Sequence, residues 1–261
     1  MTEAEAVRST THRRWPAHRK TVVWLMVAAA GLRLALFAIG PMHDPSRARF
    51  NDSQRFQSLA HNLVETGAFA LAGETPGTLY APIQEMRRER GELEPRNAHG
   101  LIPETMRTPG YPAYLAVWYA MGLGDLAALV GQCLLAAVIV PFAFGLGREI
   151  VGSNRAGYVT AALAALHPAA IVFSNTLMSE AIFSVLMVPG LWLVVWGRRR
   201  GWVWPAMGGM LIGLAALVKP VGMYLPIALA MWMIATELRW RTVLAAGACV
   251  AGALLVMGPW A

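Results

Sequence analysis

Acidic and basic residues that could do chemistry lie near both ends of one long polar stretch, residues 41–112. The motif NDSQRF near its start contains Asp52 and Arg55, and near its end Glu104 and Arg107 come just before the turn motif TPGYP. A carboxylate can act as a general base, and a guanidinium group can bind phosphate through two parallel hydrogen bonds. We therefore expect this stretch to carry an active site.

Two more charged residues, Glu180 and Lys219, adjoin apolar runs later in the chain. Glu180 comes shortly after the polar residues 174–176, and Lys219 is followed by Pro220. Charged side chains at membrane depth are costly and commonly functional, so both are site candidates. The structural alternatives are a helix cap for Glu180 and an interfacial anchor for Lys219.

The residues of the polar stretch have structural alternatives too. Asp52 could cap the helix that follows it, and Arg107 could form an ion pair with Glu104. Arg33 lies inside the first apolar run and could extend toward the membrane surface. Asp44, in the same polar stretch, is the nearest rival of Asp52 for the role of general base.

The composition identifies a polytopic membrane protein. Hydrophobic residues make up 56% of the chain and charged residues 14%, and the mean hydropathy is +0.47, which is too apolar for a soluble domain. The net charge of +7 could indicate nucleic-acid binding, but the basic residues cluster between apolar runs, where they set membrane topology. Cys133 and Cys249 lie in apolar runs without metal-ligand spacing, so no zinc or disulfide framework and no metal site is predicted.

The apolar runs predict an all-α protein with about seven transmembrane helices. These runs cover residues 21–40, 126–147, 156–173, 180–197, 203–218, 221–236 and 242–260. A helix needs about 20 residues to cross a bilayer, so residues 113–124 are too short and should form an interfacial helix. The first run is too long for the apolar core of a signal peptide. His167-Pro168 predicts a kink.

The basic residues then set the orientation. Residues 1–20 form a basic cytoplasmic tail, and residues 41–112 form a long extracytoplasmic loop. If residues 113–124 do not span, three basic clusters fall on the cytoplasmic side, whereas a spanning segment would place all three outside. These clusters are Arg148 with Arg155, Arg198 to Arg200, and Arg239 with Arg241.

Four stretches carry a resemblance to a known family. They are NDSQRFQSLAHNLVETGAFA, RTPGYPAYLA, HPAAIVFSNTLMSEAIF and GLAALVKPVG. In order and spacing, about residues 25–261 resemble membrane glycosyltransferases of the GT-C fold, in the group of the dolichyl-phosphate-mannose protein mannosyltransferases and lipid A aminoarabinose transferases. This resemblance implies transfer of a hexose or pentose from a polyprenyl-phosphate donor, with inversion, to a protein, lipid or polysaccharide acceptor. It implies no required cofactor, although some relatives use a divalent cation.

The chemistry of such a transfer suggests roles for the charged residues. Asp52 matches the acid of the family's first loop and would be the catalytic base. Lys219 and Arg107 would contact the donor phosphate, with Arg55 and Arg33 behind them. The supporting acids would be Glu180, Asp44 and Glu104.

Two departures from the family pattern bear on function. The charged segment between residues 73 and 107 looks like an insertion that contacts the acceptor. Family members usually continue beyond the final Pro-Trp, so residues 21–261 are expected to be a transferase module without its C-terminal spans. We expect an integral protein of a bacterial plasma membrane, with lipid and no nucleic acid as its partners. The alternatives are a transporter or lipid flippase, and a truncated, non-catalytic member of the same fold.

Overall fold

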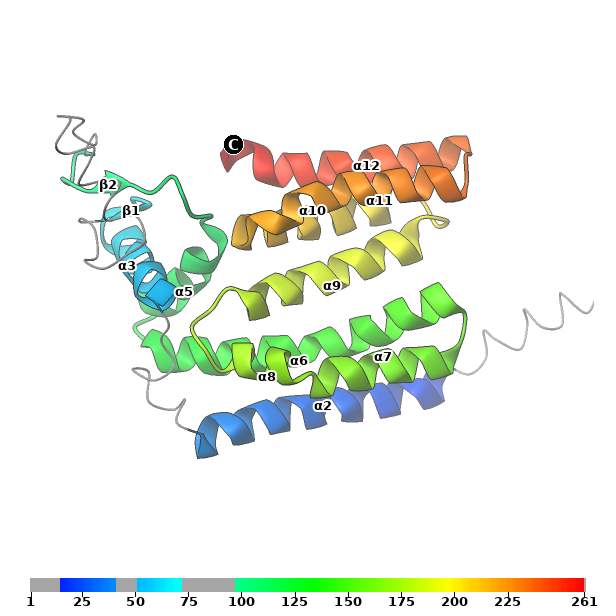
Figure 1. Cartoon of the computed structure of the whole chain (residues 1–261), viewed down its shortest axis with the longest axis horizontal. Helices are drawn as coiled ribbons and strands as arrows, with labels where there is room; N and C mark the ends of the chain where they lie inside the picture. Colours follow the sequence, from blue (N-terminus) through cyan, green and yellow to red (C-terminus); the bar gives the residue numbers. More distant parts are fainter. Residues whose placement is uncertain (1–14, 41–50, 72–96, 261) are drawn as a thin grey trace, which may run out of the picture.

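The computed structural model describes residues 15–40, 51–71 and 97–260, which form a layer of roughly parallel and antiparallel helices with smaller elements at one end (Figure 1). Residues 72–96, which include most of the proposed insertion, and Asp44 lie outside the described residues. The helices that run along the bundle are α2 (Trp15–Ile39), α6 (Gly124–Val151), α7 (Asn154–Leu166), α8 (Pro168–Ser174), α9 (Glu180–Gly197), α10 (Val203–Val218), η3 (Pro220–Tyr224), α11 (Leu225–Thr236), α12 (Trp240–Met257) and η4 (Gly258–Trp260).

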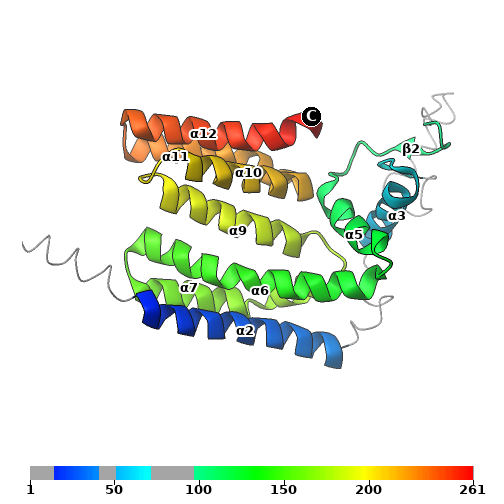
Figure 2. The same ribbon diagram turned by 180° about the vertical axis from the view of Figure 1, so that it is seen from behind.

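The smaller elements gather at one end of this bundle, which we call the loop face (Figures 1 and 2). They are α3 (Asn51–Thr66), α5 (Gly110–Ala120), β1 (Ala70–Leu71) and β2 (Ile102–Pro103). The two short strands pair antiparallel, with Ala70 opposite Pro103 and Leu71 opposite Ile102. The end of α12 lies on this side as well, where Trp260 packs edge-on against Phe69 with ring centroids 5.1 Å apart.

Helix α3 forms because its apolar residues recur on one face. Phe56, Leu59 and Ala60 are buried at spacings of three and four residues, and this face packs on α5. The acidic residue in its first turn, Asp52, also suits the positive end of the helix dipole. Packing of this face therefore fixes the orientation in which α3 presents Asp52.

The structure shows part of the predicted set of membrane spans. Among the described residues, α2, α6, α9 and α12 are long and apolar enough to cross a membrane, and the bent pair α7–α8 can be counted as a fifth span. Seven spans are not shown, because α10 and the segment Pro220–Thr236 are only shorter apolar helices. At about 1.5 Å per residue, 16 residues reach about 24 Å, which is less than the roughly 30 Å of a bilayer core.

The predicted kink at His167-Pro168 is confirmed. Helices α7 and α8 meet there at 47°, and the His167 ring accepts a hydrogen bond from the Ala170 backbone nitrogen at 3.3 Å. Proline has no backbone N–H to donate to the residue four positions earlier, so the helix breaks at this point. Residues 156–173 are therefore two helices and not one straight span.

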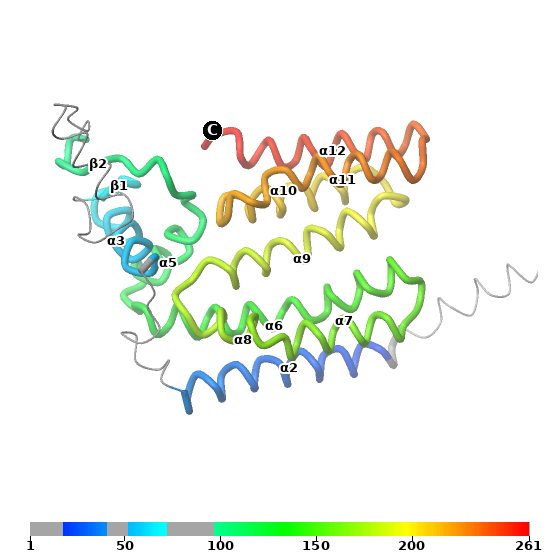
Figure 3. Tube along the Cα trace, viewed as in Figure 1, coloured from blue at the N-terminus to red at the C-terminus, as the bar shows by residue number. Residues whose placement is uncertain are grey.

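The basic clusters share the end of the bundle away from the loop face, which we call the opposite face. The turns α6–α7, α9–α10 and α11–α12 and the start of α2 all lie there in the views of Figures 1 and 3. The helices therefore alternate in direction as predicted. Which face is outside the cell stays a prediction.

Close packing of small residues holds the later helices together. A Cβ atom on Gly209 of α10 would lie 2.0 Å from the carbonyl oxygen of Cys249 in α12, so only glycine allows this approach. The two cysteines are free and buried, as predicted from their apolar surroundings.

Candidate functional site

The first charged pair of the loop face joins α3 to the segment before α5. A terminal nitrogen of Arg107 lies 2.7 Å from Oδ1 of Asp52, and the Arg107 guanidinium lies 5.2 Å from the centre of the Phe56 ring. Asp52 and Phe56 are four residues apart, so both project from the same side of α3. The Asp52 side chain is 50% exposed, which leaves the carboxylate open to a substrate.

The sequence left two structural alternatives for this pair: a helix cap for Asp52 and an ion pair between Arg107 and Glu104. Helix α3 begins at Asn51, so Asp52 lies within its first turn and does not precede the helix. Arg107 contacts Asp52, whereas Glu104 contacts Arg55. The alternative pair of Arg107 with Glu104 is therefore not formed in this structure.

The second pair joins the end of α10 to the start of α9. The Lys219 ammonium lies 2.7 Å from Oε1 of Glu180, and the lysine side chain is 40% exposed. Oε2 of Glu180 is buried and makes no hydrogen bond with another described residue. Glu180 is the first residue of α9, where the helix dipole favours a negative charge. The pair therefore places a cation and a partly unsatisfied carboxylate on the loop face.

The third pair is more enclosed. Nε of Arg55 lies 3.8 Å from Oε2 of Glu104, and the two side chains are 12% and 3% exposed. Oε1 of Glu104 accepts a hydrogen bond from the Met106 backbone nitrogen at 2.8 Å. Glu104 thus orders the chain just before Arg107, so the contacts of this pair position the segment that carries the first pair.

The first two pairs lie on neighbouring segments. The hydroxyl of Thr108, the residue after Arg107, donates a hydrogen bond at 3.1 Å to the carbonyl of Val218, the residue before Lys219. A Cβ atom on Gly110 would lie 2.7 Å from the Leu217 carbonyl oxygen, so glycine is needed for α5 to begin this close to α10. The TPG turn therefore brings Arg107 toward the segment that carries Lys219.

A buried hydrogen-bond chain connects the remaining motifs. Ser53 of α3 donates to the Leu177 carbonyl at 2.8 Å, in the connection that leads into α9. Tyr111 donates to Oε1 of Gln132 at 3.1 Å, and Nε2 of Gln132 donates to the Thr176 carbonyl at 2.7 Å. These contacts link three of the motifs, and the hydrogen bond from Thr108 to the Val218 carbonyl joins the fourth.

Burial keeps the tyrosine of this chain in its neutral form. The pKa of the Tyr111 hydroxyl is raised well above its usual value, chiefly by burial and then by the neighbouring Tyr114. A neutral hydroxyl can donate to Gln132 throughout the physiological pH range. The Tyr111 hydroxyl therefore serves as a hydrogen-bond donor to Gln132 in this structure.

Two polar residues that join elements of the loop face to α6 were not identified from the sequence. Gln132 is fully buried in α6. The sequence feature that could have revealed it is a lone amide in an apolar run. Asp125, at the start of α6, accepts hydrogen bonds from the Tyr119 hydroxyl and, at 2.6 Å, from Nε2 of Gln57 in α3. Asp125 thereby helps to hold α3 against the bundle.

Arg33 contacts backbone groups rather than the three pairs. It is 1% exposed, and one terminal nitrogen donates to the carbonyls of Ala29 at 3.0 Å and Ala165 at 3.1 Å. Its other terminal nitrogen donates to the Ala164 carbonyl at 3.3 Å. Pro168 cannot donate to that carbonyl, so Arg33 satisfies the end of the broken helix α7. These contacts explain a structural role, and the predicted role at the donor phosphate stays a prediction.

The described part of the site offers general-base and phosphate-binding groups. Asp52 is a half-exposed carboxylate, and Arg107 and Lys219 supply cations from adjoining segments. Among the described residues, no group of three His, Cys, Asp or Glu side chains could hold a metal ion. The chemistry that these groups support is deprotonation of a hydroxyl beside a bound phosphate.

One protein family matches the later part of the chain. Residues 106–261 match the model of the dolichyl-phosphate-mannose-protein mannosyltransferase family, a match that includes Arg107, Glu180 and Lys219. Searches of curated proteins and of solved structures give no match. Because the match covers more than half of the chain, the protein belongs to this family of GT-C membrane glycosyltransferases that use lipid-phosphate sugar donors.

Proposed function

We propose that this chain transfers a sugar from a polyprenyl-phosphate donor to an acceptor hydroxyl on the outer side of the membrane, with inversion at the anomeric carbon. The observation that carries the proposal is the contact between the TPG turn and the end of α10, which places the Asp52–Arg107 pair beside the segment of Lys219. Family membership supplies the class of donor.

In the proposed reaction, the Asp52 carboxylate takes the proton from the acceptor hydroxyl. The acceptor oxygen then forms a bond to the anomeric carbon, and the bond between this carbon and the phosphate oxygen breaks. Its electron pair leaves with the polyprenyl phosphate. The Asp52–Arg107 ion pair uses Oδ1, so Oδ2 of the half-exposed carboxylate can receive the proton.

Arg107 and Lys219 have the complementary role of stabilising the negative charge that grows on the departing phosphate. A guanidinium binds two phosphate oxygens at once, and an ammonium adds a compact charge. Glu180 holds the Lys219 ammonium at 2.7 Å, and Glu104 with Arg55 orders the segment that leads to Arg107. Glu180, Glu104 and Arg55 are therefore positioning residues in this proposal.

The proposed function can be tested with membranes that contain this chain and a radiolabelled polyprenyl-phosphate sugar. Transfer of label to a protein, lipid or polysaccharide fraction would support a transferase, and membranes without the chain provide the control. Import of a free solute without label transfer would identify a transporter instead. Neither activity, despite a folded and inserted chain, would indicate a non-catalytic member of the fold.

The proposed orientation has its own test. Gly91→Cys and Arg199→Cys place single reactive thiols in the loop 41–112 and on the opposite face, once the buried Cys133 and Cys249 have been replaced. We expect an impermeant maleimide to label the first variant in intact cells and the second only after permeabilisation. External labelling at position 199 would contradict an outward-facing site.

A further inference from the structure

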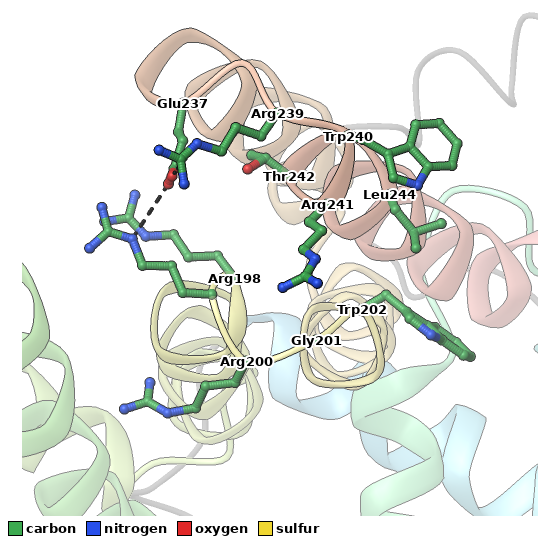
Figure 4. Close-up of a pocket in the computed structure, with 11 residues that line it drawn as sticks. Arg198, Arg200, Gly201, Trp202, Glu237, Arg239, Trp240, Arg241, Thr242 and Leu244 are labelled. Atoms are coloured by element: carbon green, nitrogen blue, oxygen red, sulfur yellow. Dashed lines mark ion pairs between the residues drawn. The ribbon is translucent and has the colours of Figure 1, made fainter.

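A basic pocket lies on the opposite face, between the α9–α10 turn and the α11–α12 turn (Figure 4). Its volume is about 830 Å³, which is within the range of small-molecule sites. Glu237 is the one acidic residue among the described residues that line it. Its basic lining consists of Arg198, Arg199, Arg200, Arg239 and Arg241.

The single carboxylate cannot neutralise these five cations. Its two oxygens lie 3.5 Å from Nε of Arg199 and 3.3 Å from Nε of Arg239. Both arginine side chains are mostly exposed, so these contacts are weak and screened by solvent. The pocket therefore keeps a strong excess of positive charge.

The other three arginines have no carboxylate partner among the described residues. Arg198 lies over the Trp232 ring with 4.7 Å to its centre, and Arg200 lies over the Trp196 ring at 4.3 Å. These rings hold two guanidinium groups in place without neutralising them. Arg241 makes no ion pair, hydrogen bond or ring contact with another described residue, and in Figure 4 its side chain reaches between the two turns.

The backbone adds to this positive potential. Helices α10 and α12 both begin at the pocket, after Trp202 and Arg239. Neither helix has an acidic residue in its first turn or a side chain that caps it. Free N–H groups at the start of a helix favour an anion, so they add to the preference for a negatively charged ligand that the arginines create.

One side of the pocket is apolar. Figure 4 shows Trp202, Trp240 and Leu244 on the side away from Arg198 and Arg200. Trp202 is 54% exposed, Trp240 76% and Leu244 43%. Leu244 and Trp240 belong to α12, a candidate membrane span, so this side of the pocket continues onto the exposed apolar side chains of that helix. Tryptophan is typical of the boundary between hydrocarbon and headgroups.

We propose that this pocket binds the phosphate headgroup of an anionic glycerophospholipid, with an acyl chain against Trp240 and Leu244. The arginines supply the charge and the hydrogen-bond donors, with Arg241 and Arg198 as the principal contacts. The apolar side selects a lipid over a free anion. This site lies at the end of the bundle away from the glycosyl-transfer site and does not depend on the proposed function.

Native mass spectrometry of the full chain in neutral detergent can test this proposal. We expect phosphatidylglycerol to bind more tightly than phosphatidylcholine with the same acyl chains. Arg241→Gln and, separately, Arg198→Gln should each weaken phosphatidylglycerol binding by roughly tenfold or more, because each loses a charged hydrogen bond. Arg155→Gln is the matched control, since this exposed arginine is on the same face but does not line the pocket.

Three results would overturn the proposal. Equal weakening in all three variants would indicate diffuse attraction of anionic lipid to a basic surface. Equal binding of both lipids to the unaltered chain would remove the preference for an anionic headgroup. Full displacement of phosphatidylglycerol by millimolar inorganic phosphate would identify a site for free anions. Thermal unfolding of each variant shows whether a loss of binding reflects a loss of fold.

Discussion

In the loop-face pairs that Asp52 and Glu180 form, the cationic nitrogen lies 2.7 Å from a carboxylate oxygen. On the opposite face, five arginines line one pocket with Glu237 as their acidic neighbour among the described residues. The loop face therefore has carboxylates matched to cations, whereas the opposite face has a large excess of cations.

The two faces differ because charged residues have two different roles in a membrane protein. Acid–base chemistry needs a carboxylate that stays ionised and a cation that stabilises the leaving group, so both signs occur together. Topology and attraction to anionic headgroups need only positive charge. The following substitutions test this comparison, from the largest expected effect to the smallest.

Asp52→Asn should have the largest effect. It keeps the shape of the side chain and a hydrogen bond to Arg107 but removes the base, so turnover should fall by roughly 10²–10⁴-fold. Label transfer in membranes measures turnover, and donor binding and expression should be nearly unchanged. Arg155→Gln on the opposite face is the control and should keep normal transfer. Wild-type turnover of Asp52→Asn would reject this assignment and direct attention to Asp44 and Glu180.

Lys219→Ala should act on donor binding. Loss of one charged contact to phosphate is expected to raise the KM for the donor by roughly 10–100-fold, and excess donor should partly restore the rate. Lys219→Arg keeps the charge and should show a smaller change. A fall in kcat with no change in the donor KM would argue against contact with the donor phosphate.

Arg33→Leu should mainly reduce stability. It leaves the carbonyls of Ala164 and Ala165 without their buried donor, at a cost of about 1–3 kcal/mol for each unsatisfied group. Thermal unfolding in detergent measures this change, and the donor KM of the remaining folded protein should stay normal. A raised KM at unchanged stability would instead support the predicted role of Arg33 at the phosphate.

Ser53→Ala should have the smallest effect. It removes the 2.8 Å hydrogen bond to the Leu177 carbonyl, which corresponds to a loss of about 1 kcal/mol in stability. A modest decrease in the unfolding midpoint is expected, with a small decrease in transfer as α3 loosens. Ser58→Ala is the control, because Ser58 is exposed and, among the described residues, its hydroxyl donates a hydrogen bond within α3, to the Gln54 carbonyl.

Particular residues show how far the sequence could predict the site. Arg107 is predicted from its place in the polar stretch, just before the TPGYP motif, and Lys219 from its charge beside an apolar run. Both lie in the matched family region. The sequence suggested Glu104 as the ion-pair partner of Arg107, whereas the structure pairs Arg107 with Asp52. Gln132 was missed because a single amide in an apolar run gives no periodic signal, although burial makes its hydrogen bonds important.

The sequence by itself determined that this is a membrane protein, where its apolar runs and basic clusters lie, and to which family it belongs, because hydropathy and motif order are local properties of the chain. Only the tertiary structure decided that Asp52 pairs with Arg107 and that Arg33 satisfies the end of α7. It also decided which apolar runs are long enough to be candidate spans. Such pairings depend on contacts between residues far apart in the chain, which the packing of whole helices creates.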